Sequence, residues 1–252
     1  MTSSKMPVAL VTGGGRGIGA ATAKLLAARG FQLVISFVNN EASATSTVDA
    51  IKDAGGHAKA IKSDVAQERD VLGLFAELDA SFGQLDVMVN NAGIVGLPVT
   101  VADMSFERLD TMMRTNIVGS FLCAREAVNR MAISKGGRGG VIVNLSSAAA
   151  RLGSPNQYVD YAASKAAIDT FTKGLALEVA ADGIRVNAVA PGIIDTEIHA
   201  SGGLPDRARD MAPSVPMKRS GSAEEVAKAI DFLVSDASSY TTGTVLDVTG
   251  GR

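Results

Sequence analysis

The sequence feature that most constrains the fold is an apolar run that ends in a glycine-rich turn. Residues 8–11 are Val-Ala-Leu-Val, and residues 12–19 read Thr-Gly-Gly-Gly-Arg-Gly-Ile-Gly. Residues 20–29 follow directly, and their alanine and leucine content favours a helix. In the order strand, glycine turn, helix, backbone N–H groups can approach a phosphate, because glycine permits a tight turn and a helix N-terminus favours negative charge.

The turn also fits the generic dinucleotide-binding pattern G-x-G-x-x-G/A, with Gly15, Gly17 and Ala20 at its fixed positions. A flexible surface loop is the alternative explanation for so many glycines. The position of the turn between an apolar run and a helix-forming stretch favours the dinucleotide site.

Apolar runs and helix-forming stretches alternate along the rest of the chain. Strands are predicted for residues 8–11, 31–37, 57–62, 85–89, 141–145, 185–189 and 244–248. Helices are predicted for residues 20–29, 41–54, 67–82, 105–133, 158–181 and 223–235. This alternation predicts an α/β fold, namely one doubly wound, Rossmann-type sheet of seven parallel strands with helices on both faces. No shift in composition divides the 252 residues, so a single domain over 1–252 is expected.

Two connections are unusual in composition. Residues 136–140 read Gly-Gly-Arg-Gly-Gly and precede an apolar run rather than a helix, so we expect a hairpin-like connector there. Residues 193–220 lose all periodicity and contain Gly202-Gly203 and several prolines. A segment this long without regular structure in a compact domain is usually functional, and we predict that it is a substrate lid.

Small and polar residues follow the predicted strands at their carboxyl ends. They are the turn at 12–19, the Asn-Asn-Ala-Gly of residues 90–93, Ser146-Ser147 and Pro191-Gly192. In a doubly wound sheet the ligand crevice lies outside the carboxyl ends of the strands. We therefore expect these four segments to line one crevice.

Tyr161 and Lys165 stand four residues apart in an alanine-rich stretch, which places both on one face of a helix. A phenol has a pKa near ~10 and is a poor acid or base at neutral pH. An ammonium at about 4 Å, under an effective dielectric constant of about 20, supplies roughly 4 kcal/mol, or about three pKa units, in favour of the phenolate. The pair is thus suited to proton transfer, although a solvated helix face can carry the same two residues by chance.

Composition argues against several other classes of protein. The 24 basic and 26 acidic residues are spread along the chain and leave a net charge of -2, so no nucleic-acid partner is expected. No long apolar run and no basic-then-apolar leader occurs, so neither a membrane span nor a signal peptide is expected. Cys123 is the only cysteine, which fits the cytoplasm. His57 and His199 are far apart in the sequence, and no metal site is expected.

With these motifs assembled, the chain resembles the short-chain dehydrogenase/reductase family over essentially its whole length. Within that family it is similar to bacterial reductases of the 3-oxoacyl-carrier-protein reductase and glucose 1-dehydrogenase type. The matching elements are Thr12-Gly13-x-x-x-Gly17-x-Gly19, Asn90-Asn-Ala-Gly93, Asn116, Ser147, Tyr161-x-x-x-Lys165, and Pro191-Gly192 with Thr196.

The resemblance implies hydride transfer between a nicotinamide and a carbonyl or secondary alcohol of a small-molecule substrate. Tyr161 would pass the proton to or from the substrate oxygen, and Lys165 would keep that phenol partly ionised and bind the nicotinamide ribose. Ser147 would polarise the carbonyl, and Asn116 would anchor a water that links Lys165 to solvent. The residues implied in cofactor binding are Gly13, Gly15, Arg16, Gly17, Ile18, Gly19, Phe37, Asp64, Val65, Asn91, Ala92, Gly93, Tyr161, Lys165, Pro191, Gly192, Ile194 and Thr196.

Two positions have a rival next to them. Tyr158 is a second phenol, but Ala162 stands four residues after it, so it lacks the lysine. Ser146 rivals Ser147, and the alternating direction of side chains on a strand lets only one of them face the crevice. Aligning Gly153 with the glycine that usually follows the catalytic serine in the family favours Ser147.

The cofactor is expected to be NADP(H), with NAD(H) also used. An NAD-binding site places a carboxylate at the end of the second strand, where Phe37 stands here. Arg16 lies in the glycine turn, within reach of a 2′-phosphate, unless it is only a solvated loop residue. A homotetramer is expected, partly from the family and partly from the apolar faces of the helices at 105–133 and 158–181. A cofactor-binding sensor or scaffold without turnover is the alternative function.

Overall fold

The computed structural model describes residues 6–252, except for the side chains of His199 and Ser201; the polar tail at 1–5 lies outside the described residues. Its single sheet has seven strands in the order β3-β2-β1-β4-β5-β6-β7, and every neighbouring pair is parallel. The α/β prediction with one doubly wound sheet is confirmed. The strands are β1 Val8–Val11, β2 Gln32–Phe37, β3 Ala58–Lys62, β4 Val87–Asn90, β5 Gly140–Leu145, β6 Ile184–Pro191 and β7 Val245–Val248.

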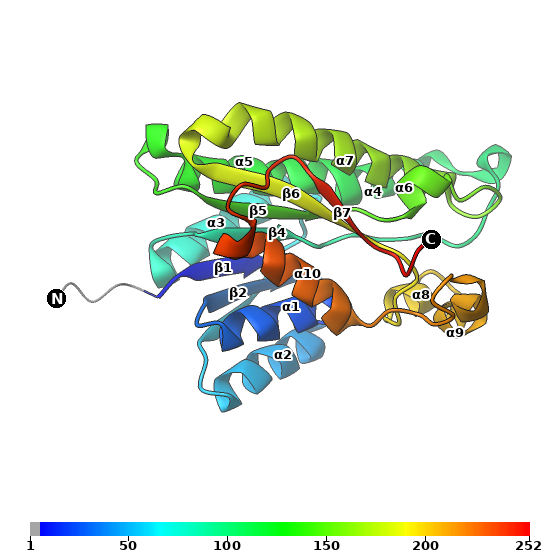
Figure 1. Cartoon of the computed structure of the whole chain (residues 1–252), viewed down its shortest axis with the longest axis horizontal. Coiled ribbons are helices and arrows are strands. Elements are labelled where there is room, and N and C mark those ends of the chain that lie inside the picture. The colour runs from blue at the N-terminus through cyan, green and yellow to red at the C-terminus, as the bar shows by residue number, and fades with distance from the viewer. Residues whose placement is uncertain (1–5) are drawn as a thin grey trace.

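Helices connect the strands and cover both faces of the sheet (Figure 1). The α-helices are α1 Gly17–Ala28, α2 Glu41–Asp53, α3 Glu68–Phe82, α4 Phe106–Met113, α5 Gly119–Met131, α6 Ala149–Leu152, α7 Val159–Val179, α8 Ile198–Ser201, α9 Arg207–Met211 and α10 Ala223–Val234. On one face of the sheet lie α1, α2 and α10, and on the other lie α3, α5 and α7.

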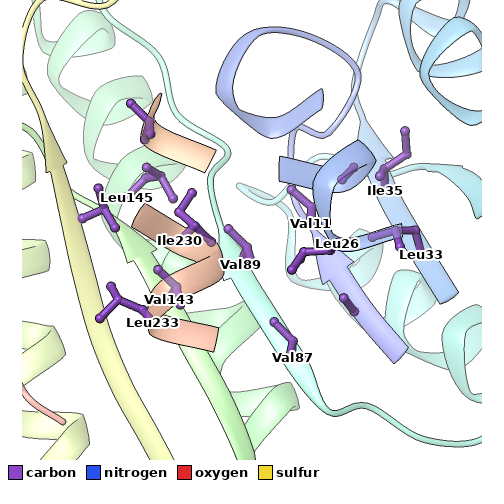
Figure 2. Packing of buried hydrophobic residues seen from close by; sticks show 14 of the residues in the cluster. Val11, Leu26, Leu33, Ile35, Val87, Val89, Val143, Leu145, Ile230 and Leu233 are labelled. Carbon is purple, nitrogen blue, oxygen red and sulfur yellow. The ribbon is translucent and has the colours of Figure 1, made fainter. Parts of the chain in front are cut away.

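Two apolar clusters hold these layers together, because successive residues of each strand point to opposite faces. Val11 of β1 is fully buried in the cluster under α1, α2 and α10, whereas Leu10 is fully buried in the cluster under α3, α5 and α7. Figure 2 shows Leu26 of α1 beside Val11 in the first cluster. Ile230 of α10 packs over the same face near Val143 of β5 (Figure 2).

The register of the strands aligns their carboxyl ends at one edge of the sheet. Val11 is level with Ile35 of β2 and with Val89 of β4. Asn90 is level with Asn144 of β5. The chain leaves β1 toward β2 and later returns to β4 on the other side of β1, which is the topological switch point where doubly wound folds bind ligands.

Several boundaries differ from the sequence-based prediction. Helix α1 begins at Gly17 rather than at residue 20, so the glycine turn itself enters the helix. The helix expected at 105–133 is divided by a π-helical segment, Arg114–Val118, between α4 and α5. Residues 136–140 are not a hairpin-like connector, because β5 pairs in parallel with both of its neighbours.

The segment 193–220 is also more regular than expected. It contains α8, α9 and a short 3-10 turn at Ala212–Ser214. Gly202-Gly203 and Pro205 lie between α8 and α9, where glycine and proline end a helix, and Pro213 lies within the 3-10 turn. Helices this short leave no periodic signal in the sequence, and α6 was missed for the same reason.

Candidate active site

A cavity of about 400 Å³ opens at the carboxyl edge of the sheet, where β4, β5 and β6 end. Its volume is within the range of small-molecule sites. The structure brings together ten of the residues expected from the sequence in the wall of this cavity: Ile18, Asn91, Gly93, Ser147, Tyr161, Lys165, Pro191, Gly192, Ile194 and Thr196. Four chain segments that are far apart in the sequence therefore meet at this cavity, as was predicted from their positions after the carboxyl ends of the strands.

The glycine turn after β1 needs glycine for two separate reasons. Gly13 and Gly17 have φ values of +63° and +50°, which side chains other than glycine rarely adopt. A Cβ on Gly19 would lie 2.4 Å from the Gly13 carbonyl oxygen, so a side chain there would push the turn away from α1. The family spacing Gly13, Gly17, Gly19 therefore describes this turn better than the generic reading at Gly15, Gly17 and Ala20.

The N-terminus of α1 lies at this turn and has no side-chain cap. Arg16 occupies the cap position with an extended backbone, and its side chain accepts nothing from the first turn. By contrast, Asn40 caps α2 and Ser222 caps α10. The first N–H groups of α1 therefore remain available for an anion such as a pyrophosphate.

Asn91 joins the glycine turn to the end of β4. Its Nδ2 donates to the carbonyl oxygens of Thr12 and Gly13 at 2.8 and 3.1 Å. The Thr12 hydroxyl in turn accepts from the backbone N–H groups of Asn91 and Ala92, both at 3.0 Å. These bonds make the edge between β1 and β4 rigid, and the Asn91 side chain acts here as a structural brace.

Tyr161 faces the cavity from the first turns of α7, and its phenol hydrogen-bonds the Ser147 side chain. Burial raises the pKa of Tyr161 to about 12, and the Ser147 bond lowers it only in part. The neighbouring Tyr158 ring packs edge-on at 5.8 Å between ring centres. At neutral pH, with the protein's own groups alone, this phenol carries its proton.

Lys165 lies one helical turn beyond Tyr161 and is almost fully buried. Its ammonium donates to the Leu145 carbonyl oxygen at 2.6 Å and lies 5.7 Å from the centre of the Tyr161 ring. Burial lowers the pKa of Lys165 to about 8, and the Asp169 carboxylate opposes this only weakly. The ammonium is thus directed to a backbone carbonyl, and in the protein alone burial has the largest effect on the Tyr161 pKa.

Asn116 lies in the π-helical segment between α4 and α5 and is fully buried. Its amide bonds both backbone groups of Ile94, accepting from the N–H at 2.8 Å and donating to the carbonyl at 3.0 Å. It also donates to the Ser164 hydroxyl at 3.0 Å, which donates to the Tyr161 carbonyl. Asn116 therefore positions the chain after β4 against the turn of α7 that carries Tyr161.

Both serines and both tyrosines contribute to the cavity wall, so the expectation that only one serine faces the crevice is wrong; the rivals differ in their hydrogen-bond partners. The Ser146 hydroxyl turns toward α7, donating to the Lys165 carbonyl at 3.3 Å, while Ser147 bonds Tyr161. Tyr158 also lines the cavity, and a cation lies beside it although no lysine follows it at helical spacing. The Arg207 guanidinium of α9 lies 5.2 Å from its ring centre. A sequence search at helical spacing could not find this contact, because Arg207 comes from a distant segment.

An ion pair anchors the start of α7 just before Tyr161. The buried carboxylate of Asp160 accepts two bonds from Arg108 of α4, at 2.8 and 3.1 Å. Arg108 also fills the space next to Gly96, where a Cβ would lie 2.8 Å from its Cζ. This clamp, which the sequence analysis missed, restricts the position of the helix that carries Tyr161.

The remaining expected cofactor residues lie outside the cavity wall. Arg16 is exposed, and within residues 6–252 its guanidinium has no bonded partner. Phe37 packs partly against the cluster under α1 and α2. Asp64 is half-buried and accepts from the Ala66 N–H at 3.0 Å. Val65 is 4% exposed and packs into the opposite cluster, so only its backbone could reach an adenine.

Comparisons with known proteins agree with this geometry. A family model described as enoyl-(acyl carrier protein) reductase matches residues 13–252. The chain belongs to the short-chain dehydrogenase/reductase family. An uncharacterized oxidoreductase of Escherichia coli K12, YgfF, is 52% identical over 98% of this chain and 100% of its own length.

Other relatives in the short-chain dehydrogenase/reductase family carry more specific names. A 3-oxoacyl-[acyl-carrier-protein] reductase of Synechocystis is 38% identical, over 100% of this chain and 98% of the relative. Glucose 1-dehydrogenase 2 of Bacillus subtilis is 37% identical, over 96% and 93%. A solved short-chain dehydrogenase of Burkholderia cenocepacia in complex with NADP superposes with a TM-score of 0.87 at 34% identity, covering 97% of each chain. The chain is therefore an oxidoreductase, and the resemblance inferred from its motifs is confirmed.

Two further features bear on the class of protein. Within residues 6–252, no helix combines the length and apolar character needed to cross a membrane. Over the same residues, no three His, Cys, Asp or Glu side chains gather in a way that could hold a metal ion.

Proposed function

We propose that this chain is an NADP(H)-preferring oxidoreductase that transfers a hydride between the nicotinamide and a carbonyl or secondary alcohol, with Tyr161 as proton donor and acceptor. The observation that carries the proposal is the convergence of Ser147, Tyr161 and Lys165 on one cavity. The uncapped start of α1 and the close-packed glycine turn beside that cavity fit a dinucleotide pyrophosphate.

In the direction of reduction, a bound nicotinamide supplies the hydride to the carbonyl carbon. The Ser147 hydroxyl and the Tyr161 phenol both point into the cavity and form a pair of donors for the carbonyl oxygen. Because burial keeps Tyr161 protonated, the phenol is ready to donate its proton as negative charge develops on that oxygen. Lys165 lies on the same face of α7, where its positive charge stabilises the phenolate that remains.

Oxidation of an alcohol requires the reverse proton transfer and therefore a phenolate. Because burial raises the pKa of Tyr161, we expect kcat/KM for alcohol oxidation to rise with pH from neutral into the alkaline range. The rate of carbonyl reduction should stay level and fall only where the phenol loses its proton. Initial rates measured in both directions from pH 6 to pH 10 check this, and parallel profiles in the two directions would contradict it.

The experiment that tests the function is to follow nicotinamide absorbance with a panel of ketones and alcohols, using each cofactor in turn. The proposal requires steady turnover of at least one substrate. A cofactor-binding sensor or scaffold would bind the dinucleotide, seen by calorimetry, and yet leave its absorbance unchanged with every substrate. The names of the relatives, which include acyl and sugar substrates, indicate that the panel must be broad.

The cofactor preference is proposed from two positions. Phe37 stands where a carboxylate would repel a 2′-phosphate, and the exposed Arg16 guanidinium can donate to that phosphate. The solved relative in complex with NADP supports the same choice. Arg16→Ala should weaken NADP(H) more than NAD(H), by about ten- to a hundredfold in kcat/KM. Phe37→Asp should shift the preference toward NAD(H).

These two variants need different controls. Phe37 packs partly against the core, so the melting temperature of Phe37→Asp must be compared with that of the wild type. Arg29→Ala removes another exposed arginine, one that pairs with Asp231 away from the glycine turn, and should leave the preference unchanged. A wild-type enzyme that favours NAD(H) in kcat/KM would contradict the argument without affecting hydride transfer.

We also propose a homotetramer. Helices α4, α5 and α7 expose large apolar side chains, including Phe106 at 82%, Phe121 at 47% and Leu177 at 76% of their surface. Phe121 and Phe171 stack at 3.8 Å and join the outer faces of α5 and α7. Light scattering should give about four times the chain mass of 25.8 kDa, and a monomer at micromolar concentration would contradict the proposal.

The remaining proposals concern organisation and location. We propose one domain over residues 1–252, with the segment at 193–220 as the substrate lid, because Ile194, Thr196 and Arg207 of that segment line the cavity. A cytoplasmic location is proposed because the single cysteine, Cys123, cannot form an intramolecular disulfide, which fits a reducing compartment.

A further inference from the structure

We propose that the substrate carries a carboxylate in addition to its carbonyl or alcohol group, and that Arg207 and Arg252 bind this carboxylate. The inference rests on the proposed function and names the substrate class for the same cavity. The inference is based on two charged side chains in the cavity wall that have no role in proton or hydride transfer.

The charged side chains among the described residues that line the cavity are all cationic. Its lining residues include Lys165, Arg207 and Arg252, and among the described residues that line it there is no aspartate or glutamate. Lys165 belongs to the catalytic group, which leaves two guanidinium groups without a role in the chemistry. Cationic groups partly removed from water are unfavourable without a negative partner, so a cavity of this composition favours an anionic ligand.

Arg207 is held in place but is not satisfied. Its Nη2 donates to the Gln157 side chain at 2.9 Å, and the guanidinium also bonds the Tyr158 phenol and lies 5.2 Å from that ring centre. Its Nε is buried and has no hydrogen-bond partner. A buried donor without a partner is costly, and a ligand oxygen would satisfy it.

The two arginines of α9 differ in their ion-pair partners. Arg209, two residues after Arg207, forms ion pairs with Asp206 and Asp210 on the exposed face at 2.9 and 3.3 Å. In the part of the chain that the structure describes, neither Arg207 nor Arg252 forms an ion pair. Carboxylates therefore balance the charge of the arginine that faces solvent, whereas, among the described residues, no carboxylate balances the charge of the arginine that faces the cavity.

The two arginines line the cavity near Tyr158, the neighbour of the Tyr161 phenol. Both influence Tyr158, since the charges of Arg207 and Arg252 each lower its pKa, against the larger effect of burial, which raises it. The Tyr158 ring neighbours both residues, since it lies 5.2 Å from the Arg207 guanidinium and 5.8 Å from the Tyr161 ring. A molecule whose carbonyl oxygen is at Ser147 and Tyr161 could therefore extend past Tyr158 and present a carboxylate to the guanidinium, which forms two parallel bonds with such a group.

The test compares oxo acids with their uncharged amides. Linear oxo acids of increasing length, from 4-oxopentanoate upward, and their primary amides are assayed with NADPH and the wild-type protein. At least one acid should exceed its amide by about ten- to a hundredfold in kcat/KM. Arg207→Gln and Arg252→Gln should each remove most of that difference through KM, while turnover of the amide changes less than about threefold. Arg209→Gln is the matched control on α9 and should change neither substrate.

Three outcomes would overturn the inference. The amides could match or exceed the acids in the wild type at every length. The two variants could lower acid and amide turnover equally, which is what a purely structural role predicts. They could instead raise the KM for NADPH alone, which would assign the arginines to a cofactor phosphate. Failure of the proposed function gives a different result, because no ketone, acid or amide, would then oxidise NADPH. Binding of the acids to the wild type and to Arg207→Gln, measured by ligand NMR, would still test the carboxylate site.

Discussion

Tyr161→Phe is expected to lower kcat by about 10²–10⁴ or more while leaving the affinity for the nicotinamide cofactor nearly intact. The variant keeps the ring, so its edge-on packing with Tyr158 is preserved. It removes the hydroxyl that bonds Ser147 and that we propose as the proton donor to the substrate oxygen. The measurements are kcat for the best substrate of the panel and the cofactor dissociation constant by fluorescence or calorimetry.

Two other phenols in the chain serve as controls for this result. Tyr240 is fully exposed, so Tyr240→Phe should have wild-type kinetics. Tyr158→Phe tests the rival phenol and should retain more turnover than Tyr161→Phe, because its hydroxyl bonds Arg207 rather than Ser147. Near-normal kcat in Tyr161→Phe would remove the central argument of the mechanism.

Lys165→Met is expected to lower kcat by about 10²–10⁴ and, unlike Tyr161→Phe, to weaken cofactor binding as well. Its ammonium is the cationic group on the Tyr161 face of α7, and Gly93 lies close beside it, since a Cβ there would be 3.5 Å from Nζ. The loss of this charge would remove the two proposed roles of Lys165, which are to stabilise the phenolate and to donate to the nicotinamide ribose. Cofactor affinity equal to that of the wild type would show that the second role is wrong.

The same variant should not be destabilised at neutral pH. Burial lowers the pKa of Lys165 from 10.5 to about 8, so between these values the unfolded chain binds more protons than the folded protein. Wild-type stability therefore rises with pH through this window, and at pH 7 the buried charge is a cost. Methionine has a similar volume and carries no charge, although the Leu145 carbonyl loses its donor. We expect the melting temperature of Lys165→Met at pH 7 to equal or exceed that of the wild type, and the alkaline gain in stability to disappear.

Lys173→Met is the matched control for both measurements, because Lys173 is an exposed lysine on the same helix. It should change neither kcat nor the pH dependence of stability. A marked loss of melting temperature in Lys165→Met, without one in Lys173→Met, would mean that the buried ammonium stabilises the fold rather than serving the chemistry.

Local patterns in the sequence were sufficient to predict the architecture. Alternating apolar runs and helix-forming stretches predicted the parallel sheet, because strands covered on both faces are apolar throughout, whereas the helices need only one apolar side to pack on the sheet. The glycines of the turn were recognised from their spacing, since a positive φ at Gly13 and Gly17 is a requirement of the local backbone. The pairing of Tyr161 with Lys165 followed from the period of the helix alone.

The boundaries were less predictable where two local preferences compete. The turn residues Gly17 and Gly19 are poor helix formers, yet they begin α1, because packing against the turn and β1 outweighs their propensity. The π-helical segment at Arg114–Val118 was visible only as a polar interruption around Asn116, whose hydrogen bonds to Ile94 join residues 22 apart in sequence. Short helices such as α8 and α9 contain too few turns to give a period.

The sequence by itself thus determined the fold, the family and the placement of Tyr161 and Lys165 on one helix face, because each depends on spacing within one segment or on the alternation of segments. Only the tertiary structure decided which serine bonds Tyr161, where the Lys165 ammonium points and which cations face the cavity. Ser146 and Ser147 are neighbours whose side chains diverge according to what packs behind β5. Arg207 and Arg252 reach the cavity from separate segments, and contacts between segments distant in the chain arise from the packing of the whole molecule, which leaves no local pattern to detect.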